Sequence, residues 1–595
     1  MKLLEGLSLK HFSILLVAGH SLVSAAQEGT TPEPMLASSA VSLEHAVGVD
    51  RERIPIACAV ANPQPVTEQL GVSTSILLPS GSRAWQSVPG VIRSDGIESF
   101  RLEVDTNGPV IAVTLDGVPA SLVLPGPTPL VLGDDGLGGD RVAGDFVFTS
   151  PSLRWNTSSN LPPFYLNDPA SPSGLHVTDV GIVTIEELGG TVTRFLVRPS
   201  VGILRSDIAA TAVQSLSPDS AASTHLINIR TDARETQRFL RSLGGNLANL
   251  TNPIYEVLPD EFDFFMFFST NKIEVLPLAD AANFRAGIHT TAQVNYAGTG
   301  LDVFDRTASF GSNGRLLGAN VLDAYRRGLS SNNATHELLH QWVAFTSTVL
   351  GLNPDGAHYD PRSSAESLVG GFRWVDNGDG SFTIDCSEGQ NAAHHASPLD
   401  KYMMGLIDAA DVPPLYVYSG ASPAPTVRCA TGEPIVPNEI VNTKTIGDIQ
   451  AVHGVRIPSS AEARREFAIA FVAESHERFL NETEMTFYNI LAEHYTKTLP
   501  TGDPAPYVST NWAPLTRFFQ EGTTWKSEIP LPAGPGDLDG DGDVDRSDLN
   551  ILLAARNTPA SGPEDPADLD QDGMITALDA RMLVLLCTRT ACATG

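Results

Sequence analysis

Residues 335–343 read THELLHQWV and contain two histidines four residues apart, His336 and His340, with Glu337 between them. At 3.6 residues per turn, this spacing places both imidazoles on one face of a helix, with the carboxylate beside them. Imidazoles bind zinc, and a neighbouring carboxylate can take a proton from an attacking water. The pattern predicts a hydrolytic zinc site with Glu337 as general base. The alternative is that both histidines are ordinary surface or core residues.

A catalytic zinc needs three protein ligands and one open position. We expect His358 to be the third ligand, because it follows the helix closely in a Gly- and Pro-flanked loop that can fold back over it. Glu366 and the pair His394 and His395 are the alternatives. The longer pattern H-E-x-x-H-x-x-G-x-x-H is absent, since QWVAFT follows His340.

Two acidic segments begin 31 residues apart and read DLDGDGDVDRSD and DLDQDGMITALD. Both fit a twelve-residue calcium loop with oxygen ligands at positions 1, 3, 5, 7 and 12. The predicted ligands are Asp537, Asp539, Asp541, Asp543 and Asp548 in the first loop, and Asp568, Asp570, Asp572, Met574 and Asp579 in the second. Residues 537–579 carry 12 acidic and 2 basic side chains, a net charge of −10 that repels itself unless cations neutralise it. We therefore expect two Ca²⁺ ions rather than a disordered acidic tail.

The helix that carries the histidine pair is expected to begin at Asn332 or Asn333, which can cap it, and to end before Gly351. Further helices are expected at residues 232–243, 459–479 and 482–499, and buried strands at 225–231 and 262–270. Short β-branched runs separated by Gly, Pro, Asn and Asp fill residues 65–205 and are typical of a β-sandwich.

The expected fold is multidomain, as a chain of 595 residues requires. We divide it into a signal peptide (1–26), a poorly ordered lead-in (27–64), an all-β, Ig-like sandwich (65–205), an α+β domain (206–527), a Pro/Gly linker (528–536) and a small α-helical pair of calcium loops (537–595). The formal net charge of −31 argues against a nucleic-acid partner. No apolar run after the signal peptide is long enough to span a membrane, so we expect a secreted protein.

Export permits disulfides. Cys587 pairs with Cys592, and Cys386 with Cys429, in the expected scheme, which leaves Cys58 over. A loop at residues 132–149, LGDDGLGGDRVAGDFVFT, resembles one in secreted Ig-like modules. Tight Gly/Asp turns are its favoured interpretation. Calcium at Asp134, Asp135, Asp140 and Asp145 is the alternative.

An apolar segment follows each acidic loop, and position 12 is Asp where a standard EF-hand has Glu. In these features residues 535–590 resemble a type I dockerin domain. The resemblance implies calcium binding and a cohesin-type scaffold partner. The partner-reading positions of the two repeats differ, with Arg546 and Ser547 in one and Ala577 and Leu578 in the other. The resemblance therefore implies calcium binding more strongly than it implies a cohesin partner.

Three motifs together make residues 260–420 similar to a group of bacterial secreted zincin-like proteins. They are the His-Glu-x-x-His pentad, the hairpin WVDNGDGSF (374–382) and SPLDKYMMGL (397–406). The similarity implies a zincin-like central domain. It also suggests Met403 or Met404 beneath the metal and Tyr402 or Tyr359 near the oxyanion, although core packing is the favoured role of these four.

The expected function is that of a secreted zinc metallopeptidase that hydrolyses a protein or peptide substrate and carries a dockerin module. One alternative is a dockerin-bearing, polysaccharide-degrading hydrolase of O-glycosyl bonds, which would need two carboxylates flanking the bond. The other is a non-catalytic extracellular binding or scaffold component.

Overall fold

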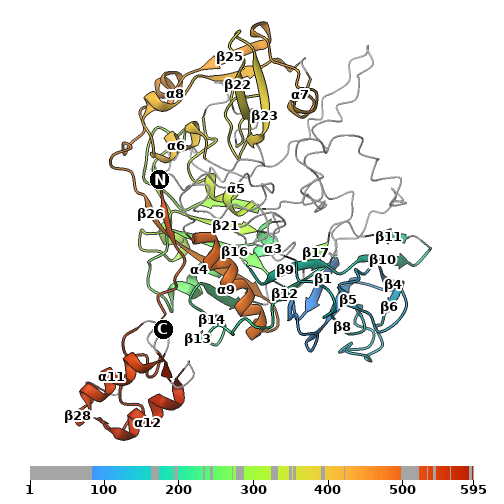
Figure 1. The fold of residues 1–595 in the computed structure, drawn as a ribbon, viewed down its shortest axis with the longest axis vertical. Coiled ribbons are helices and arrows are strands. Elements are labelled where there is room, and N and C mark those ends of the chain that lie inside the picture. The colour runs from blue at the N-terminus through green and yellow to red at the C-terminus, as the bar shows by residue number, and fades with distance from the viewer. Residues whose placement is uncertain are drawn as a thin grey trace, which may run out of the picture.

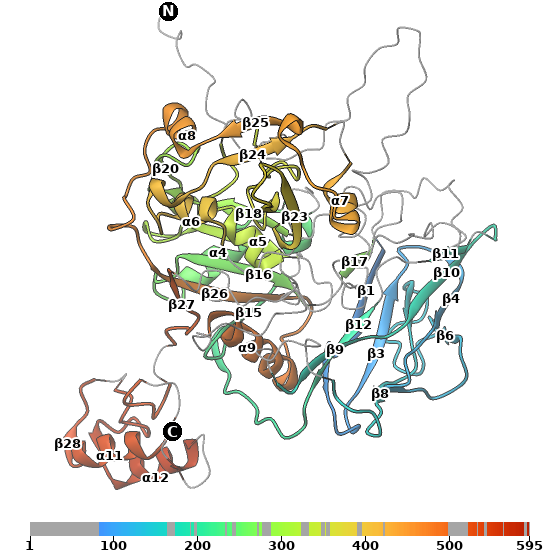
Figure 2. The same ribbon diagram turned by 45° about the horizontal axis from the view of Figure 1, so that its top comes forward.

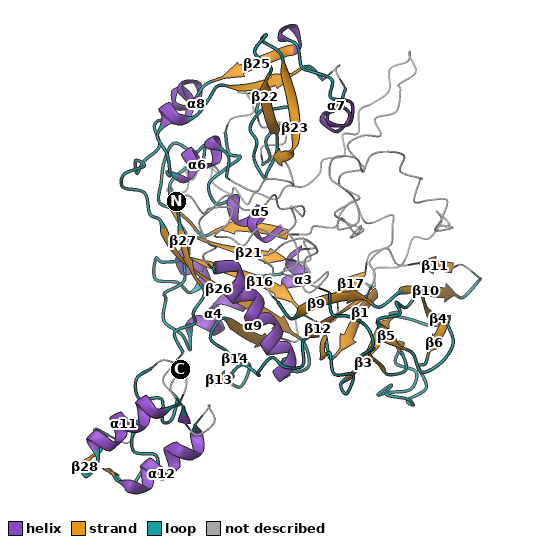
Figure 3. Ribbon diagram, viewed as in Figure 1, coloured by secondary structure: helices purple, strands orange, loops and turns teal. Residues whose placement is uncertain are grey.

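The computed structural model describes residues 83–162, 173–190, 192–194, 199–231, 235–240, 245–270, 273–275, 287–322, 333–346, 351–352, 357–389, 396–420, 423–497, 522–531, 534–540, 544–562, 565–587 and 592–593. Figure 1 shows an N-terminal β-rich part, a central part and a C-terminal helical pair, and strands outnumber helices outside that pair (Figure 3). The predicted signal peptide, the lead-in and Cys58 lie outside the described residues.

Two main sheets build the N-terminal part and share one apolar core, to which Trp85, Leu102, Val113 and Ile185 contribute. Such a core between two sheets is typical of a sandwich. The first sheet has the order β17-β1-β3-β8-β5 with β7 beside β3, the second β11-β10-β4-β6, and a third β2-β12-β9. The strands are β1 (Arg83–Val88), β2 (Val91–Arg93), β3 (Ser99–Asp105), β4 (Val110–Asp116), β5 (Leu122–Val123), β6 (Leu130–Leu132), β7 (Val147–Thr149), β8 (Leu153–Trp155), β9 (Leu175–Asp179), β10 (Ile182–Glu187), β11 (Val192–Arg194), β12 (Ser200–Leu204) and β17 (Ile273–Val275).

The central part is organised around a mixed eight-stranded sheet of order β13-β14-β15-β26-β16-β21-β18, with β27 beside β26. Strands β15, β26, β16 and β21 are parallel, and β18 closes one edge antiparallel to β21. The strands are β13 (Gln214–Ser217), β14 (Ser220–Ala222), β15 (Leu226–Arg230), β16 (Phe264–Ser269), β18 (Gly287–Thr291), β21 (Gly318–Leu322), β26 (Glu466–Ser475) and β27 (Thr524–Lys526).

Helices cover both faces of this sheet. Residues of β16 alternate between two cores, with Phe264, Met266 and Phe268 on one side and Phe265 and Phe267 on the other. The first core includes residues of α5 (Asn333–Leu339) and α9 (Glu482–Thr496), and the second includes residues of α3 (Glu235–Leu240) and α4 (Ala248–Tyr255). Because both faces are covered, every residue of β16 is buried.

Two sequence predictions about this region are wrong. Residues 459–479 were expected to be helical, but Glu466–Ser475 is the buried strand β26 at the centre of the sheet. A strand buried on both faces is apolar throughout, so its hydrophobic spacing does not distinguish it from a buried helix. The helix with the histidine pair starts at Asn333, as expected, but ends at Leu339, well before Gly351.

Above the α5 face lies a small layer of hairpins and short helices (Figure 2). The predicted hairpin at 374–382 is present, since β22 (Phe372–Asp376) pairs antiparallel with β23 (Phe382–Gly389). The remaining elements of the central part, on either face of the sheet, are β19 (Gln293–Val294), β20 (Phe304–Asp305), η3 (Thr307–Phe310), α6 (Pro398–Met404), η6 (Ala409–Asp411), β24 (Leu415–Tyr418), α7 (Pro425–Thr431), η7 (Pro437–Glu439), β25 (Ile440–Lys444) and α8 (Ile446–His453). Cys429 of α7 is disulfide-bonded; the side chain of its predicted partner, Cys386, is not among those described.

The C-terminal part consists of α11 (Arg546–Ala555) and α12 (Ala577–Leu586), each following an acidic loop, with β28 (Thr558–Pro559) paired to β29 (Met574–Ile575). In both ribbon views it lies apart from the central body (Figures 1 and 2). Its core contains Val544, Leu552, Ile575 and Leu583, with Leu549 partly buried. Leu578, one of the partner-reading positions, lies in the first turn of α12 and is 51% exposed. Cys587 and Cys592 form the predicted disulfide.

Candidate metal centres

The three histidines singled out by the sequence lie together on the upper face of the central sheet. His336 comes from α5, His340 from the turn that ends it, and His358 from the loop beyond. Each offers a ring nitrogen, and these atoms all lie within 4.8 Å of one another. The ring centroids are 5.0 to 5.4 Å apart. The loop thus folds back over the helix, and it brings the third histidine to the pair.

The spacing of the ring nitrogens fits a single small metal ion. Nε2 of His336 and Nε2 of His340 are 3.3 Å apart. Two nitrogens bound at about 2.0–2.1 Å to one tetrahedral zinc would lie roughly 3.3–3.4 Å apart. Three imidazoles and no carboxylate in the group are a donor set that zinc accepts.

Local electrostatics favour the neutral form of His340. Burial, followed by the neighbouring imidazoles of His336 and His358, lowers the pKa of His340 well below its ordinary value. A neutral imidazole has a free lone pair for a metal. Nδ1 of His336 lies 3.2 Å from the Leu368 carbonyl oxygen. A hydrogen on Nδ1 would be donated to this oxygen, and the lone pair of Nε2 would then be available for a metal.

Glu337 lies on the same helix, half-buried, with its side chain against the edge strand β18. A Cβ atom built on Gly287 would be 2.6 Å from Cγ and 2.8 Å from Oε1 of Glu337. Only a glycine on β18 leaves room for this carboxylate. The acid thus lies between helix and strand, next in sequence to His336.

None of the other described residues that the sequence suggested for this site belongs to the histidine group. Glu366 is described but does not belong to the histidine group, and His394 and His395 lie outside the described residues. The Tyr402 hydroxyl accepts a hydrogen bond from Gln450 Nε2 at 2.9 Å, and the Tyr359 hydroxyl accepts one from the Ala344 amide. These tyrosines and the two methionines, Met403 and Met404, are buried in the main core, the role that the sequence favoured.

The first acidic loop gathers three of its predicted ligands. Asp537, Asp539 and Asp548 each offer a carboxylate oxygen within 4.8 Å of the others. Asp548, at position 12, also accepts hydrogen bonds from the amides of Leu538 and Asp545, at 2.6 and 2.7 Å. Asp541 and Asp543 lie outside the described residues.

The second loop gathers Asp568, Asp570 and Asp572 in the same way. Partial desolvation and the neighbouring carboxylates raise the pKa of Asp570, a repulsion that a bound cation would relieve. Asp579, at position 12, is fully buried and accepts from the amides of Leu569 and Thr576, so it caps α12. Gly573, with φ of 87°, makes the sharp turn expected at position 6.

Comparison with family models finds a match for this C-terminal part at residues 535–584, described as the dockerin type I domain. This segment is a type I dockerin domain. Dockerin domains bind calcium and cohesin partners, which supports calcium binding by the C-terminal loops and an extracellular, dockerin-based association of the chain. No curated protein and no solved structure matches the chain. Among the residues described, none of the helices has the length and apolar character to cross a bilayer.

The acidic loop at 132–149 forms tight turns. Asp134 accepts from the amides of Gly144 and Phe146, and Asp140 from that of Gly136. Asp134, Asp140 and Asp145 lie within 4.8 Å of one another, and Asp135 is outside the group. The favoured interpretation of this loop as Gly/Asp turns thus agrees with its hydrogen bonds.

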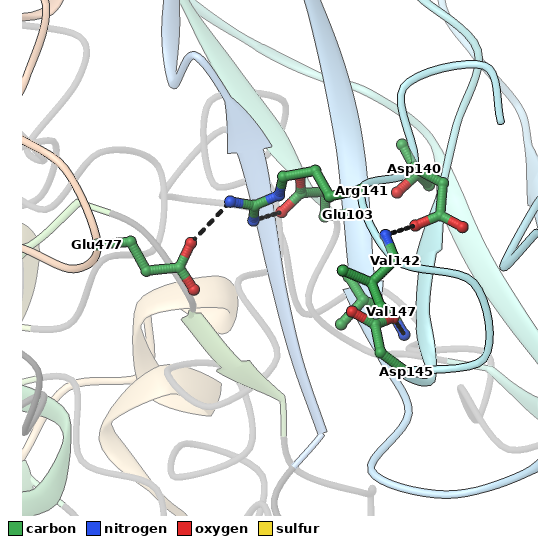
Figure 4. A pocket seen from close by; sticks show the side chains of 8 residues that line it. Glu103, Asp140, Arg141, Val142, Asp145, Val147 and Glu477 are labelled. Atoms are coloured by element: carbon green, nitrogen blue, oxygen red, sulfur yellow. Dashed lines mark hydrogen bonds and ion pairs between the residues drawn. The ribbon is translucent and has the colours of Figure 1, made fainter. Parts of the chain in front are cut away.

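Beside this loop is a small cavity of about 200 Å³ between the N-terminal and central parts. Figure 4 shows Arg141 between Glu103 of β3 and Glu477, which follows β26. The guanidinium lies 3.3 and 3.0 Å from the two carboxylates. Arg141 therefore forms an ion-pair junction between the two parts.

Sequence reasoning missed the residues that support the histidines. Gln341, next to His340, is fully buried, and His289 of β18 lies 2.9 Å from its side chain. The one signal for Gln341 was a polar residue among the apolar residues that follow the pentad. His289 and Gly287 gave none, because they reach the site only through sheet pairing.

Proposed function

We propose that the chain is an extracellular zinc-dependent hydrolase that cleaves peptide bonds and is attached to its assembly through the dockerin domain. The observation that carries the proposal is the group of three histidine nitrogens within 4.8 Å of one another. His336, His340 and His358 would hold the metal. When bound, zinc would polarise a carbonyl group and supply a nucleophile near neutral pH.

Glu337 is assigned the role of general base. Its carboxylate projects from the helix that carries His336 and leads into His340, and Gly287 leaves room for it. It would take a proton from the attacking water and later give it to the leaving amine. A carboxylate fixed between a helix and a strand needs little reorganisation to do this.

A peptide substrate is favoured by the strand next to the site. Strand β18 is at the end of the sheet order, and among the described residues it pairs only with β21. The edge of such a strand can pair with an extended peptide through main-chain hydrogen bonds. β18 also carries Gly287, so an extended peptide there would lie close to Glu337.

The alternative functions stay open to the same test. A polysaccharide-degrading hydrolase is suggested by the dockerin domain alone. It would need a pair of carboxylates across a sugar-binding site. A non-catalytic scaffold component would retain the metal without hydrolysing any substrate.

Metal analysis of the purified, full-length mature protein provides the first measurement, and the expected result is one zinc per chain in addition to calcium. His336→Ala and His358→Ala should both release zinc, because each removes one of three ligands. A His358→Ala variant that retains zinc normally would transfer the third-ligand role to Glu366 or to His394 and His395.

Activity is then measured on unstructured proteins and on polysaccharides. Glu337→Gln should retain zinc but lose about 10²–10⁴-fold in peptide hydrolysis, the usual contribution of a general acid–base group. Polysaccharide cleavage that survives Glu337→Gln would favour the glycosidase alternative. Zinc without any hydrolysis would favour the scaffold.

A further inference from the structure

Gln341 directly follows His340, and its side chain is buried under the end of α5 with no exposed surface. Its Oε1 lies 2.9 Å from Nε2 of His289 on β18. Its Nε2 donates to the Gln293 carbonyl oxygen at 2.9 Å and lies 3.2 Å from the Tyr296 hydroxyl oxygen. Both ends of the amide are therefore used, which also fixes its orientation.

The network continues into the sheet on both sides. Nδ1 of His289 lies 2.9 Å from Oδ1 of Asn320 on β21. The Tyr296 hydroxyl donates to the main-chain carbonyl of Gln341, and the guanidinium of Arg456 lies 4.9 Å from the centre of the Tyr296 ring. One glutamine thus connects the helix end to β18, to β19 and to the segment after it.

The sheet leaves space for this arrangement. A Cβ atom on Gly318 of β21 would be 2.6 Å from Cε1 of His289 and 2.8 Å from Oε1 of Gln341. Any larger residue there would push both side chains away.

His340 depends on its backbone for its position. It lies just beyond the last α-helical residue, in a turn where its amide donates to the Glu337 carbonyl at 3.2 Å. The ring of His336 is oriented by the Leu368 carbonyl, but among the described residues the ring of His340 makes its one hydrogen-bond-range contact with His336. The residue that fixes the end of the turn therefore also aims His340.

We propose that Gln341 and His289 are positioning residues that set the place of His340, and with it the geometry of the three-histidine centre. This inference rests on the proposed zinc function. A buried polar network contributes less to stability than apolar side chains of the same volume would. Its hydrogen bonds, however, are satisfied in only one arrangement of α5 on the central sheet. A metal site needs one fixed arrangement, because its ligands must be held within about 0.5 Å of the productive geometry.

The test uses the full-length protein freed of zinc and loaded with Co²⁺, whose visible absorption reports coordination geometry. Gln341→Met keeps the length of the side chain and removes its hydrogen bonds. We expect its metal dissociation constant, measured by chelator competition, to rise about 10–100-fold, as for other residues that support ligands, and its Co²⁺ spectrum to change. Gln450→Met is the matched control, because it removes a 2.9 Å amide contact, with the Tyr402 hydroxyl, that does not reach α5.

Two further variants cover the case in which Gln341→Met fails to fold. His289→Gln retains a side-chain amide that can bond Gln341, whereas His289→Leu does not. The affinity of His289→Gln should lie between those of the wild type and His289→Leu. Wild-type affinity and spectrum in folded Gln341→Met, or in both His289 variants, would overturn the inference while leaving the zinc proposal in place. If the wild-type protein binds neither zinc nor Co²⁺, the proposed function fails and this inference fails with it.

Discussion

At the scale of single residues, the metal-free protein should lose stability on acidification because of the histidine cluster. The pKa of His340 is well below 6.5 in the folded chain, mainly through burial, and that of His289 is lowered to about 4 for the same reason. The unfolded chain therefore binds more protons below about pH 6.5, so the free energy of unfolding falls as the pH falls through this window. Urea unfolding of the metal-free protein at pH 7.5 and at pH 5 measures this fall in the free energy of unfolding.

The comparison variant for this prediction is His340→Gln, which has no titrating group at this position. The loss of stability between pH 7.5 and pH 5 should be smaller in the variant than in the wild type. Equal losses in the two proteins would show that His340 titrates normally in the folded chain.

Gly287 offers a second prediction at this scale. Gly287→Ala places a methyl group 2.6 Å from Cγ of Glu337 and should displace the carboxylate, since the three atoms nearest to the methyl group all belong to Glu337. We expect kcat/KM for peptide hydrolysis to fall at least about 10-fold, part of the 10²–10⁴-fold that acid–base catalysis contributes, while zinc content stays normal. Gly126→Ala is the control, because a Cβ there meets nothing within 4 Å. Full activity of Gly287→Ala would show that Glu337 needs no such space.

At the scale of elements, sequence patterns predicted what is local. The four-residue spacing of His336 and His340, the position-by-position match of the acidic loops and the turns of residues 132–149 depend on a few neighbouring residues. The strand β26 was mistaken for a helix because its apolar residues face both covered sides of the sheet. The supports of the histidine site could not be predicted, because His289 and Gln341 meet only after β18 has paired with β21.

Helix α6 contains a buried acid whose titration can be measured. Asp400 forms a capping box with Ser397 and has no exposed surface. Burial raises its pKa from 3.8 to about 7. The folded chain then holds a proton that the unfolded chain releases, so this group lowers the free energy of unfolding as the pH rises from about 4 to 7.

Asp400→Asn keeps the shape and removes the titration. Its free energy of unfolding should fall less than that of the wild type between pH 5 and pH 8, measured by urea unfolding. A steeper fall in the variant would mean that Asp400 is stabilised as a carboxylate in the folded state.

The dockerin loops give a second prediction for elements. Asp539→Ala with Asp570→Ala removes one carboxylate from each ligand group. Calcium should increase helical circular dichroism in the wild-type protein, because repelling carboxylates oppose the docking of α11 and α12 until a cation binds. The double variant should need at least about 10-fold more calcium for the same change. An unchanged calcium midpoint would exclude these two residues as ligands.

At the scale of the whole molecule, the dockerin domain should be separable from the proposed hydrolase. Ile529, inside the predicted linker, is buried in the central core, and its amide donates to the Thr224 carbonyl. A truncation should therefore follow Leu531. We expect this shortened chain to keep zinc and peptide hydrolysis while losing calcium-dependent binding to a cohesin-type partner. A folded but inactive truncated protein would place the C-terminal domain within the catalytic unit.

The N-terminal and central parts, unlike the dockerin domain, are joined by a shared sheet. Strand β17 belongs to the chain that follows β16, yet it pairs with β1 in the first sheet of the N-terminal part. A gene fragment that ended near residue 205 would leave that edge of β1 without its partner strand, a surface that promotes aggregation. Recombination between genes can exchange the dockerin domain through its linker. The N-terminal and central parts must be inherited together.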